Sequence, residues 1–204
     1  MKKLLFIFLT LSLISFGRIS YAQLPLIKKN VSELFFDFVL NPSKFDVRKK
    51  FQSDKNFYGF DDGLNYGEYE TITAKFYSNY KTSYLASKEM RIIFWFDTGN
   101  EVSHSRKITT DFTIDEYEKC LKQVQEIYSI FSKCSYKTQK VIVDGFENQK
   151  VGEGWCFYSS DKTFKKVKPY LKVSYRYFII NKSEYMSEYK GYVFEIILDD
   201  NNVY

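Results

Sequence analysis

The sequence is poor in the residues that most catalytic and metal sites require. One histidine and three cysteines among 204 residues are too few for a histidine-rich metal site, a zinc ribbon or a haem-attachment motif. Glycine occurs nine times and proline three times, and the chain holds neither a glycine-rich phosphate loop nor a Gly-x-Ser-x-Gly motif. We therefore expect no metal, no nucleotide and no other cofactor.

Long apolar runs are missing except at the N-terminus. A run of 13 mostly apolar residues, 4–16, follows two lysines and precedes Ser20 and Ala22, which are small residues at the positions that a signal peptidase reads. A transmembrane helix needs about 20 apolar residues. We expect residues 1–22 to be a signal peptide and residues 23–204 to form a single exported domain, periplasmic or secreted, with no membrane span after cleavage. An uncleaved N-terminal anchor is the alternative.

Removal of residues 1–22 leaves a chain of nearly neutral charge. These residues hold three basic and no acidic side chains, so the remainder carries 27 Lys and Arg against 25 Asp and Glu, a net charge of +2. Charges of both signs are interspersed, which gives no strong field for nucleic acid or for an anionic membrane. The expected partner is therefore a protein, a peptide or a glycan, and not a nucleic acid.

Aromatic residues are abundant, with 20 Phe, 18 Tyr and 2 Trp. Such a composition favours strands and thick sheet packing. Alternation of apolar and polar residues predicts strands over residues 69–77, 84–97, 101–112, 138–146, 155–159, 170–180 and 189–198. Clusters of Gly, Asn and Asp predict a loop over residues 53–67 and a turn over residues 147–154, and residues 97–100 predict a tight hairpin.

Apolar residues spaced three and four apart predict three helices. Two of these are short and cover residues 30–40 and 44–52. The third is long and central, over residues 113–133, and Thr113 with Glu116 forms a capping box at its start.

The order of these elements predicts an α+β fold with predominantly antiparallel sheet, one long central helix and two short N-terminal helices. The order also resembles a duplicated helix-then-meander unit with halves 30–112 and 113–204. No residue-level repeat accompanies that resemblance.

Export would permit a disulfide bond, and three cysteines leave one unpaired. Cys120 and Cys134 lie 14 residues apart in one predicted helix, which separates them by about 21 Å. A disulfide requires Cα atoms within roughly 7 Å. Cys134, at the helix end, is therefore the preferred partner of Cys156. The alternative is three buried reduced thiols that behave as small apolar side chains.

Few residues point to catalysis. A lone His104 without a nucleophile motif is expected to be a surface polar residue. Glycoside hydrolysis needs two acids about 5 to 10 Å apart. Asp61, Asp62, Glu68 and Glu70 are candidates, but 25 acidic residues make such neighbours common by chance.

Aromatic and basic side chains on the predicted strands are the best candidates for binding. Tyr170, Arg176 and Phe178 share one predicted strand face, and Trp95 and Trp155 lie on other strands. Together they could form a shallow groove for a sugar, a peptide or a partner strand, although core filling is the competing interpretation. Our leading hypothesis is an exported, non-enzymatic binding or interaction module of the cell envelope or extracellular space. The alternatives are a secreted hydrolase that uses acidic residues on a glycan, and a periplasmic carrier of an apolar ligand.

Overall fold

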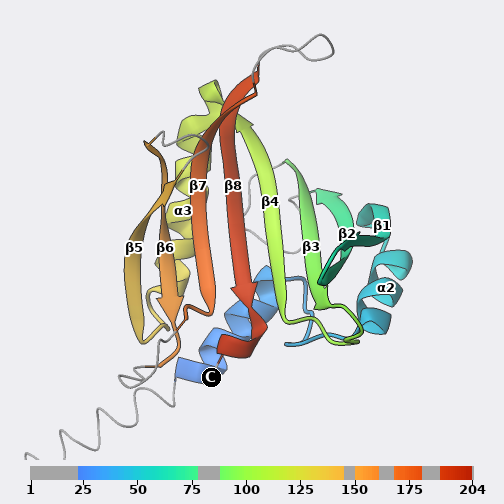
Figure 1. Cartoon of the computed structure of the whole chain (residues 1–204). Coiled ribbons are helices and arrows are strands. Elements are labelled where there is room, and N and C mark those ends of the chain that lie inside the picture. The colour runs from blue at the N-terminus through green and yellow to red at the C-terminus, as the bar shows by residue number, and fades with distance from the viewer. Residues whose placement is uncertain (1–22, 78–87, 145–149, 161–167, 181–188, 204) are drawn as a thin grey trace, which may run out of the picture.

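The protein folds around one eight-stranded antiparallel sheet with helices on one face (Figure 1). The α+β class and the antiparallel sheet predicted from the sequence are therefore confirmed. The computed structural model describes residues 23–77, 88–144, 150–160, 168–180 and 189–203. The predicted signal peptide lies outside these residues.

The sheet has the strand order β1-β2-β3-β4-β8-β7-β6-β5, and every neighbouring pair is antiparallel. Two runs of four consecutive strands thus meet where the last strand of each run, β4 and β8, pair at the centre (Figure 1). The strands are β1 (Phe57–Tyr66), β2 (Tyr69–Tyr77), β3 (Glu89–Asp97), β4 (Ser105–Thr113), β5 (Lys137–Asp144), β6 (Lys150–Tyr158), β7 (Leu171–Ile180) and β8 (Tyr189–Asp199).

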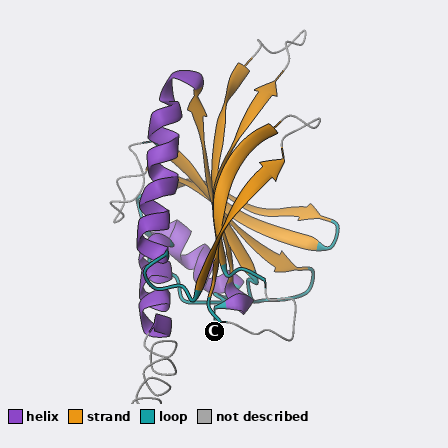
Figure 2. Ribbon diagram, turned by 90° about the vertical axis from the view of Figure 1, so that its left-hand side faces the viewer, coloured by secondary structure: helices purple, strands orange, loops and turns teal. Residues whose placement is uncertain are grey.

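The helices gather on one side of the twisted sheet, and no described helix covers the other side (Figure 2). They are a helix over residues 23–34, α2 (Lys44–Ser53) and α3 (Tyr117–Phe131), with single 3₁₀ turns η1 (Ile114–Glu116) before α3 and η3 (Asp200–Asn202) after β8. The predicted capping box of Thr113 and Glu116 is present. None of the described helices is both long and apolar enough to span a membrane.

The predicted helix over residues 30–40 is wrong at both ends. The helix already covers residue 23 and ends at residue 34, because Phe36 and Asp37 adopt left-handed φ angles of 59° and 60°. This turn directs the Phe36 ring into the sheet, where its centroid lies 4.5 Å from that of Phe76. Tertiary packing therefore overrides the local helical pattern.

Two segments that were predicted as a loop and a turn contain strand. β1 lies within residues 53–67, and its two register irregularities coincide with Gly59 and Gly63, which have φ of 57° and 102°. β6 begins at Lys150 and passes so close to β7 that a Cβ on Gly152 would lie 1.8 Å from the carbonyl oxygen of Tyr175. The glycines in both segments mark bulges and close strand approach instead of loops.

The core lies between the helices and the covered face of the sheet. α3 packs its buried side chains on β6 and β7, with the Phe131 and Phe157 ring centroids 5.7 Å apart. On β3, Ile92 and Phe94 point into this core and are fully buried. Burial of each such side chain contributes about 1.5–3 kcal/mol. The alternate residues of the same strands consequently face the uncovered side.

Candidate functional site

The uncovered face of the sheet carries a hollow of about 480 Å³ over β1, β2 and β3. We call it the Trp95 hollow. Its lining residues are Gly59, Asp61, Thr71, Thr73, Lys75, Arg91, Ile93 and Trp95.

Strand register explains why these side chains share one place. Thr71 pairs with Trp95 across β2 and β3, and Lys75 pairs with Arg91 four residues further along β2. Residues at every second position of a strand lie on one face. The hollow therefore has an apolar floor, two threonines on one side, two cations at one end, and one carboxylate, that of Asp61, in its lining.

The two cations differ in their surroundings. Lys75 Nζ lies 3.1 Å from a carboxylate oxygen of Glu89, and its aliphatic stem would lie 3.3 Å from a Cβ on Gly59. Arg91 is exposed and forms no ion pair with any carboxylate of the described residues. Its guanidinium is therefore available to an anion from solution.

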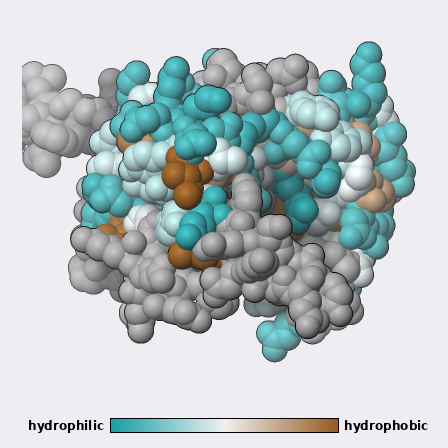
Figure 3. All heavy atoms as spheres, turned by 90° about the horizontal axis from the view of Figure 1, so that it is seen from above, coloured by the Kyte–Doolittle hydropathy of each residue, from teal (hydrophilic) through white to brown (hydrophobic). Residues whose placement is uncertain are grey.

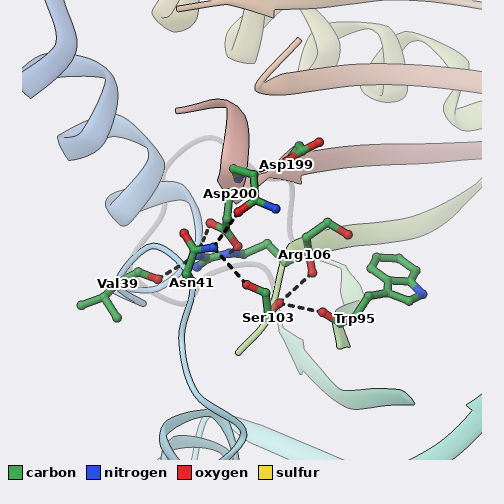
Figure 4. Close-up of polar contacts among 9 residues, drawn as sticks. Val39, Asn41, Trp95, Ser103, Arg106, Asp199 and Asp200 are labelled. Atoms are coloured by element: carbon green, nitrogen blue, oxygen red, sulfur yellow. Dashed lines mark hydrogen bonds and ion pairs between the residues drawn. The ribbon is translucent and has the colours of Figure 1, made fainter. Parts of the chain in front are cut away.

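The backbone of Trp95 is held from the core side (Figure 4). The Ser103 hydroxyl donates toward the carbonyl oxygens of Trp95 and Ser105 at 3.0 and 2.9 Å, and the His104 N–H also donates to the Trp95 carbonyl. Ser103 is fully buried. These bonds keep the end of β3 and the start of β4 in one geometry.

A buried ion pair adjoins this anchor. Arg106 donates to Asp200 through Nη2 and Nε, at 2.5 and 3.2 Å, and Nη2 also donates to the Val39 carbonyl (Figure 4). The guanidinium lies 5.4 Å from the ring centroids of Phe35 and Phe94. Burial raises the pKa of Asp200, and the Arg106 charge opposes that rise. This cluster is structural, since neither side chain has exposed surface.

A second hollow, of about 520 Å³, extends from Arg91 across β4, β8 and β7. Here Lys107 Nζ lies 2.9 Å and Arg176 Nη2 lies 3.9 Å from one carboxylate oxygen of Glu195. Asp111 also lines this hollow, and partial burial of its carboxyl raises its pKa although neighbouring cations lower it. We call this the charged hollow.

The five residues expected to form one groove lie on two faces. Trp95 lines the Trp95 hollow, Arg176 lines the charged hollow, and Phe178 follows on the same face of β7. Trp155 packs on Tyr128 of α3, on the helix side, with ring centroids 4.2 Å apart. Tyr170 is fully buried and its hydroxyl lies 2.7 Å from that of Ser135. The last two therefore fill the core.

The acidic candidates do not form a catalytic pair. Asp61 lines the Trp95 hollow, whereas Asp62 accepts two hydrogen bonds from Arg48. Glu70 accepts one from Lys44 at 2.7 Å. Adjacent residues such as Asp61 and Asp62 point to opposite faces of a strand. The sequence analysis did not identify two residues of the site, Arg91 and Lys75. Alternation showed which face of its own strand each residue occupies, but not that the two lie opposite each other in β2 and β3.

The preferred disulfide is not formed. All three cysteines are buried and free. Cys156 alternates with Trp155 and Phe157, which contact α3, so its side chain points to the opposite face. Cys134 stays on the helix side, where its Sγ accepts a hydrogen bond from Asn30 Nδ2 at 3.6 Å. The sheet therefore separates the two thiols.

Comparison with known proteins leaves this chain without a match among protein-family models, curated protein sequences or solved structures. Within the described parts of the chain, no three side chains of His, Cys, Asp or Glu gather closely enough to hold a metal ion. Function must therefore be inferred from the geometry of the chain itself.

Proposed function

We propose that the protein is an exported, non-enzymatic binding module and that an acidic saccharide binds in the Trp95 hollow. The observation that carries this proposal is Arg91, an exposed cation that forms no ion pair within the described parts of the chain and lies at the edge of an aromatic and aliphatic floor. Ligand pockets of this kind combine apolar walls with a few polar groups that orient the ligand.

The lining matches the chemistry of a sugar acid. The flat indole of Trp95 offers contact area to the apolar face of a sugar ring at low entropic cost. Thr73, which is half-buried, carries a hydroxyl that can both donate and accept a hydrogen bond. Arg91 can donate two parallel bonds to a carboxylate, which a lysine cannot. The volume of about 480 Å³ is that of a small-ligand pocket.

Isothermal titration calorimetry with hexagalacturonate and neutral maltohexaose tests the proposal. We expect the acidic sugar to bind and the neutral one to bind at least about tenfold more weakly, a difference of about 1.4 kcal/mol. Arg91→Gln and Trp95→Ala should each reduce affinity about tenfold, and Trp95→Phe should retain most of it. Lys133→Gln removes one exposed charge near the end of α3 and is the matched control.

The proposal fails if both sugars bind equally or if Arg91→Gln behaves like Lys133→Gln. An acidic peptide could bind in place of the sugar with the same sensitivity to Arg91→Gln. That result would support a binding function but would contradict the assignment of a saccharide as the ligand. Affinity should also fall with added salt, because the ion pair is solvent-exposed.

The charged hollow supports a second candidate, a glycan hydrolase. Asp111 and Glu195 lie on β4 and β8 as diagonal neighbours on one face, with a separation of about 7–8 Å between such positions. One carboxyl has a raised pKa and the other faces two cations, a division of roles that glycosidases use. Turnover of aryl glycosides that both Asp111→Asn and Glu195→Gln abolish would establish this activity, and its absence would reject it.

An apolar carrier has less support. The space between α3 and the sheet is filled by side chains of the core. Three of them, Ile127, Phe131 and Phe157, are fully buried there. A ligand there would have to displace packed side chains. Co-purified apolar mass in native mass spectrometry would contradict this view.

We also infer that the chain is a duplicated helix-then-meander unit. The support is topological: β1–β4 and β5–β8 each follow a helix, and both runs end in the central pair β4 and β8. Superposition of the two halves tests the inference. Strands and buried positions should then coincide in chain order.

A further inference from the structure

A cluster of four tyrosines lies on the helix-covered face of the sheet, opposite the Trp95 hollow. It is at the end of the molecule where α3 begins. It borders a pocket of about 540 Å³ on the helix side of the sheet. Figure 3 shows this end of the molecule, where a few hydrophobic residues are exposed among hydrophilic ones. The lining residues of this tyrosine pocket are Ile114, Tyr117, Ile142, Gly152, Glu153, Tyr175, Tyr177 and Tyr192.

The tyrosine rings form walls at angles to one another. The Tyr192 ring centroid lies 4.8 Å from that of Tyr117, 5.4 Å from that of Tyr177 and 6.0 Å from that of Tyr175. The interplanar angles of these pairs are 39°, 59° and 62°. The hydroxyls of Tyr117 and Tyr175 lie 3.1 Å apart and bind each other. Two ring hydroxyls are thus already paired.

This aromatic cluster is not closed like the core. Ile114 and Ile142, which flank it, are 47% and 66% exposed. Further along α3, Val124 and Phe131 are at most 3% exposed. Tyr175 is itself 8% exposed and belongs to the core, so a ligand would reach chiefly the half-buried rings of Tyr117, Tyr177 and Tyr192. The pocket shares no residue with either hollow of the uncovered face.

The pocket has one acidic side chain in its lining. Glu153 is the one charged side chain among the described residues that line it. Lys140 Nζ lies 2.7 Å from Glu153 Oε2, with the two side chains 53% and 49% exposed. Ion pairs as exposed as this contribute at most about 1 kcal/mol. A stronger cationic ligand can therefore recruit the carboxylate.

We propose that the tyrosine pocket binds an organic cation of the quaternary ammonium class. Ring faces carry negative electrostatic potential, and cages of aromatic rings with an acidic neighbour favour cations that are bulky and have no N–H to donate. A primary ammonium would need three acceptors, and Glu153 is the one carboxylate among the described residues that line the pocket.

The test compares choline with its neutral isostere 3,3-dimethyl-1-butanol by isothermal titration calorimetry on the purified protein. Choline should bind at least about tenfold more tightly, because the two ligands differ in charge and hardly in shape. Equal binding of the two would show an apolar pocket and overturn the proposal. The absence of choline binding by folded protein would overturn it as well.

Variants of the ion pair between Lys140 and Glu153 should change the affinity for choline in opposite directions. Glu153→Gln should weaken choline binding severalfold, and Lys140→Met should strengthen it severalfold because the carboxylate loses its competing partner. Both side chains are half exposed, so both variants should fold. Affinities that do not move in opposite directions would contradict the assignment.

Variants of the rings separate this site from the Trp95 hollow. Tyr192→Leu should weaken choline binding at least about tenfold, whereas Tyr192→Phe, which keeps the ring, should retain it. Trp95→Ala lies on the other face and should leave choline binding unchanged. Loss of choline binding in Trp95→Ala would show that the two sites are not independent, and would reject the proposed location.

Discussion

Arg106 and Asp200 lie 94 positions apart in the chain and form a two-pronged ion pair in which neither side chain has exposed surface. The same guanidinium donates to the carbonyl of Val39, which follows the first helix. A single side chain on β4 thus joins the beginning and the end of the described chain. The pair lies beside Ser103, whose hydroxyl contacts the Trp95 carbonyl oxygen (Figure 4).

Loss of one partner of this pair should destabilise the protein strongly. Asp200→Asn leaves the Arg106 charge buried without its counter-charge, which costs about 3–5 kcal/mol. Urea unfolding should show this loss. Asp199→Asn, the same change one residue earlier, retains an N-cap side chain and should cost less than about 1 kcal/mol. Equal effects of the two variants would contradict the role assigned to the pair.

Gly152→Ala should be costly because of the close approach of β6 and β7. The new Cβ would lie 1.8 Å from the carbonyl oxygen of Tyr175 and 2.6 Å from the Cα of Arg176. Backbone must move, at a cost of about 1–3 kcal/mol or more in the free energy of unfolding. Gly67→Ala is the comparison, because Gly67 has open space but a φ of 72°. A larger loss for Gly67→Ala would contradict the steric explanation.

Glu116 should make the protein sensitive to acid. A hydrogen bond from Lys88 and one from the Thr113 N–H lower the pKa of Glu116 from 4.5 to about 2. A lowered pKa stabilises the fold above about pH 4.5, and this contribution disappears as the pH falls through 2. Glu116→Gln should therefore differ most from wild type at neutral pH, by about 1 kcal/mol.

Thermal unfolding of both proteins between pH 7 and pH 2 measures this difference. It should shrink as the pH falls below 4.5. Glu118→Gln, an exposed residue two positions later, controls for the loss of one charge. A difference between wild type and Glu116→Gln that stays constant with pH would contradict the assignment.

The thiols should be free and slow to react. Burial raises the pKa of Cys120 to about 12 and also raises the pKa values of Cys134 and Cys156. Thiolate is the reactive form, so native protein should react slowly with Ellman's reagent at pH 8. Denaturation without reductant should expose three reactive thiols. A count of one would instead show a disulfide.

Local patterns predicted the elements whose signal lies within a few residues. The spacing of apolar residues in α3, and the alternation in β2, β7 and β8, follow from which side of each element is buried. The predictions of a loop and a turn were wrong where glycine is required by contacts between strands. Gly59 serves a bulge in β1, and Gly152 permits β6 to approach β7, yet both indicated turns when only neighbours in sequence were considered.

The candidate sites could be predicted only in part from the sequence, because they too depend on contacts between strands. Alternation within β3 placed Arg91 and Trp95 on one face, but the pairing with Lys75 depends on the register between β2 and β3. The tyrosine pocket depends on contacts between the start of α3 and residues of the four strands that follow it, β5 to β8. Such contacts are set by long-range packing, which short sequence windows do not contain.

The amino-acid sequence by itself determined the fold class, the long helix and the residues that share a strand face, because each of these follows from local periodicity and backbone preference. Tertiary structure alone decided which face the helices cover, where Trp155 and Tyr170 become core, and which charges meet at each hollow. The physical reason is that burial of apolar area is a property of the whole assembly of strands and helices, and no single segment carries it.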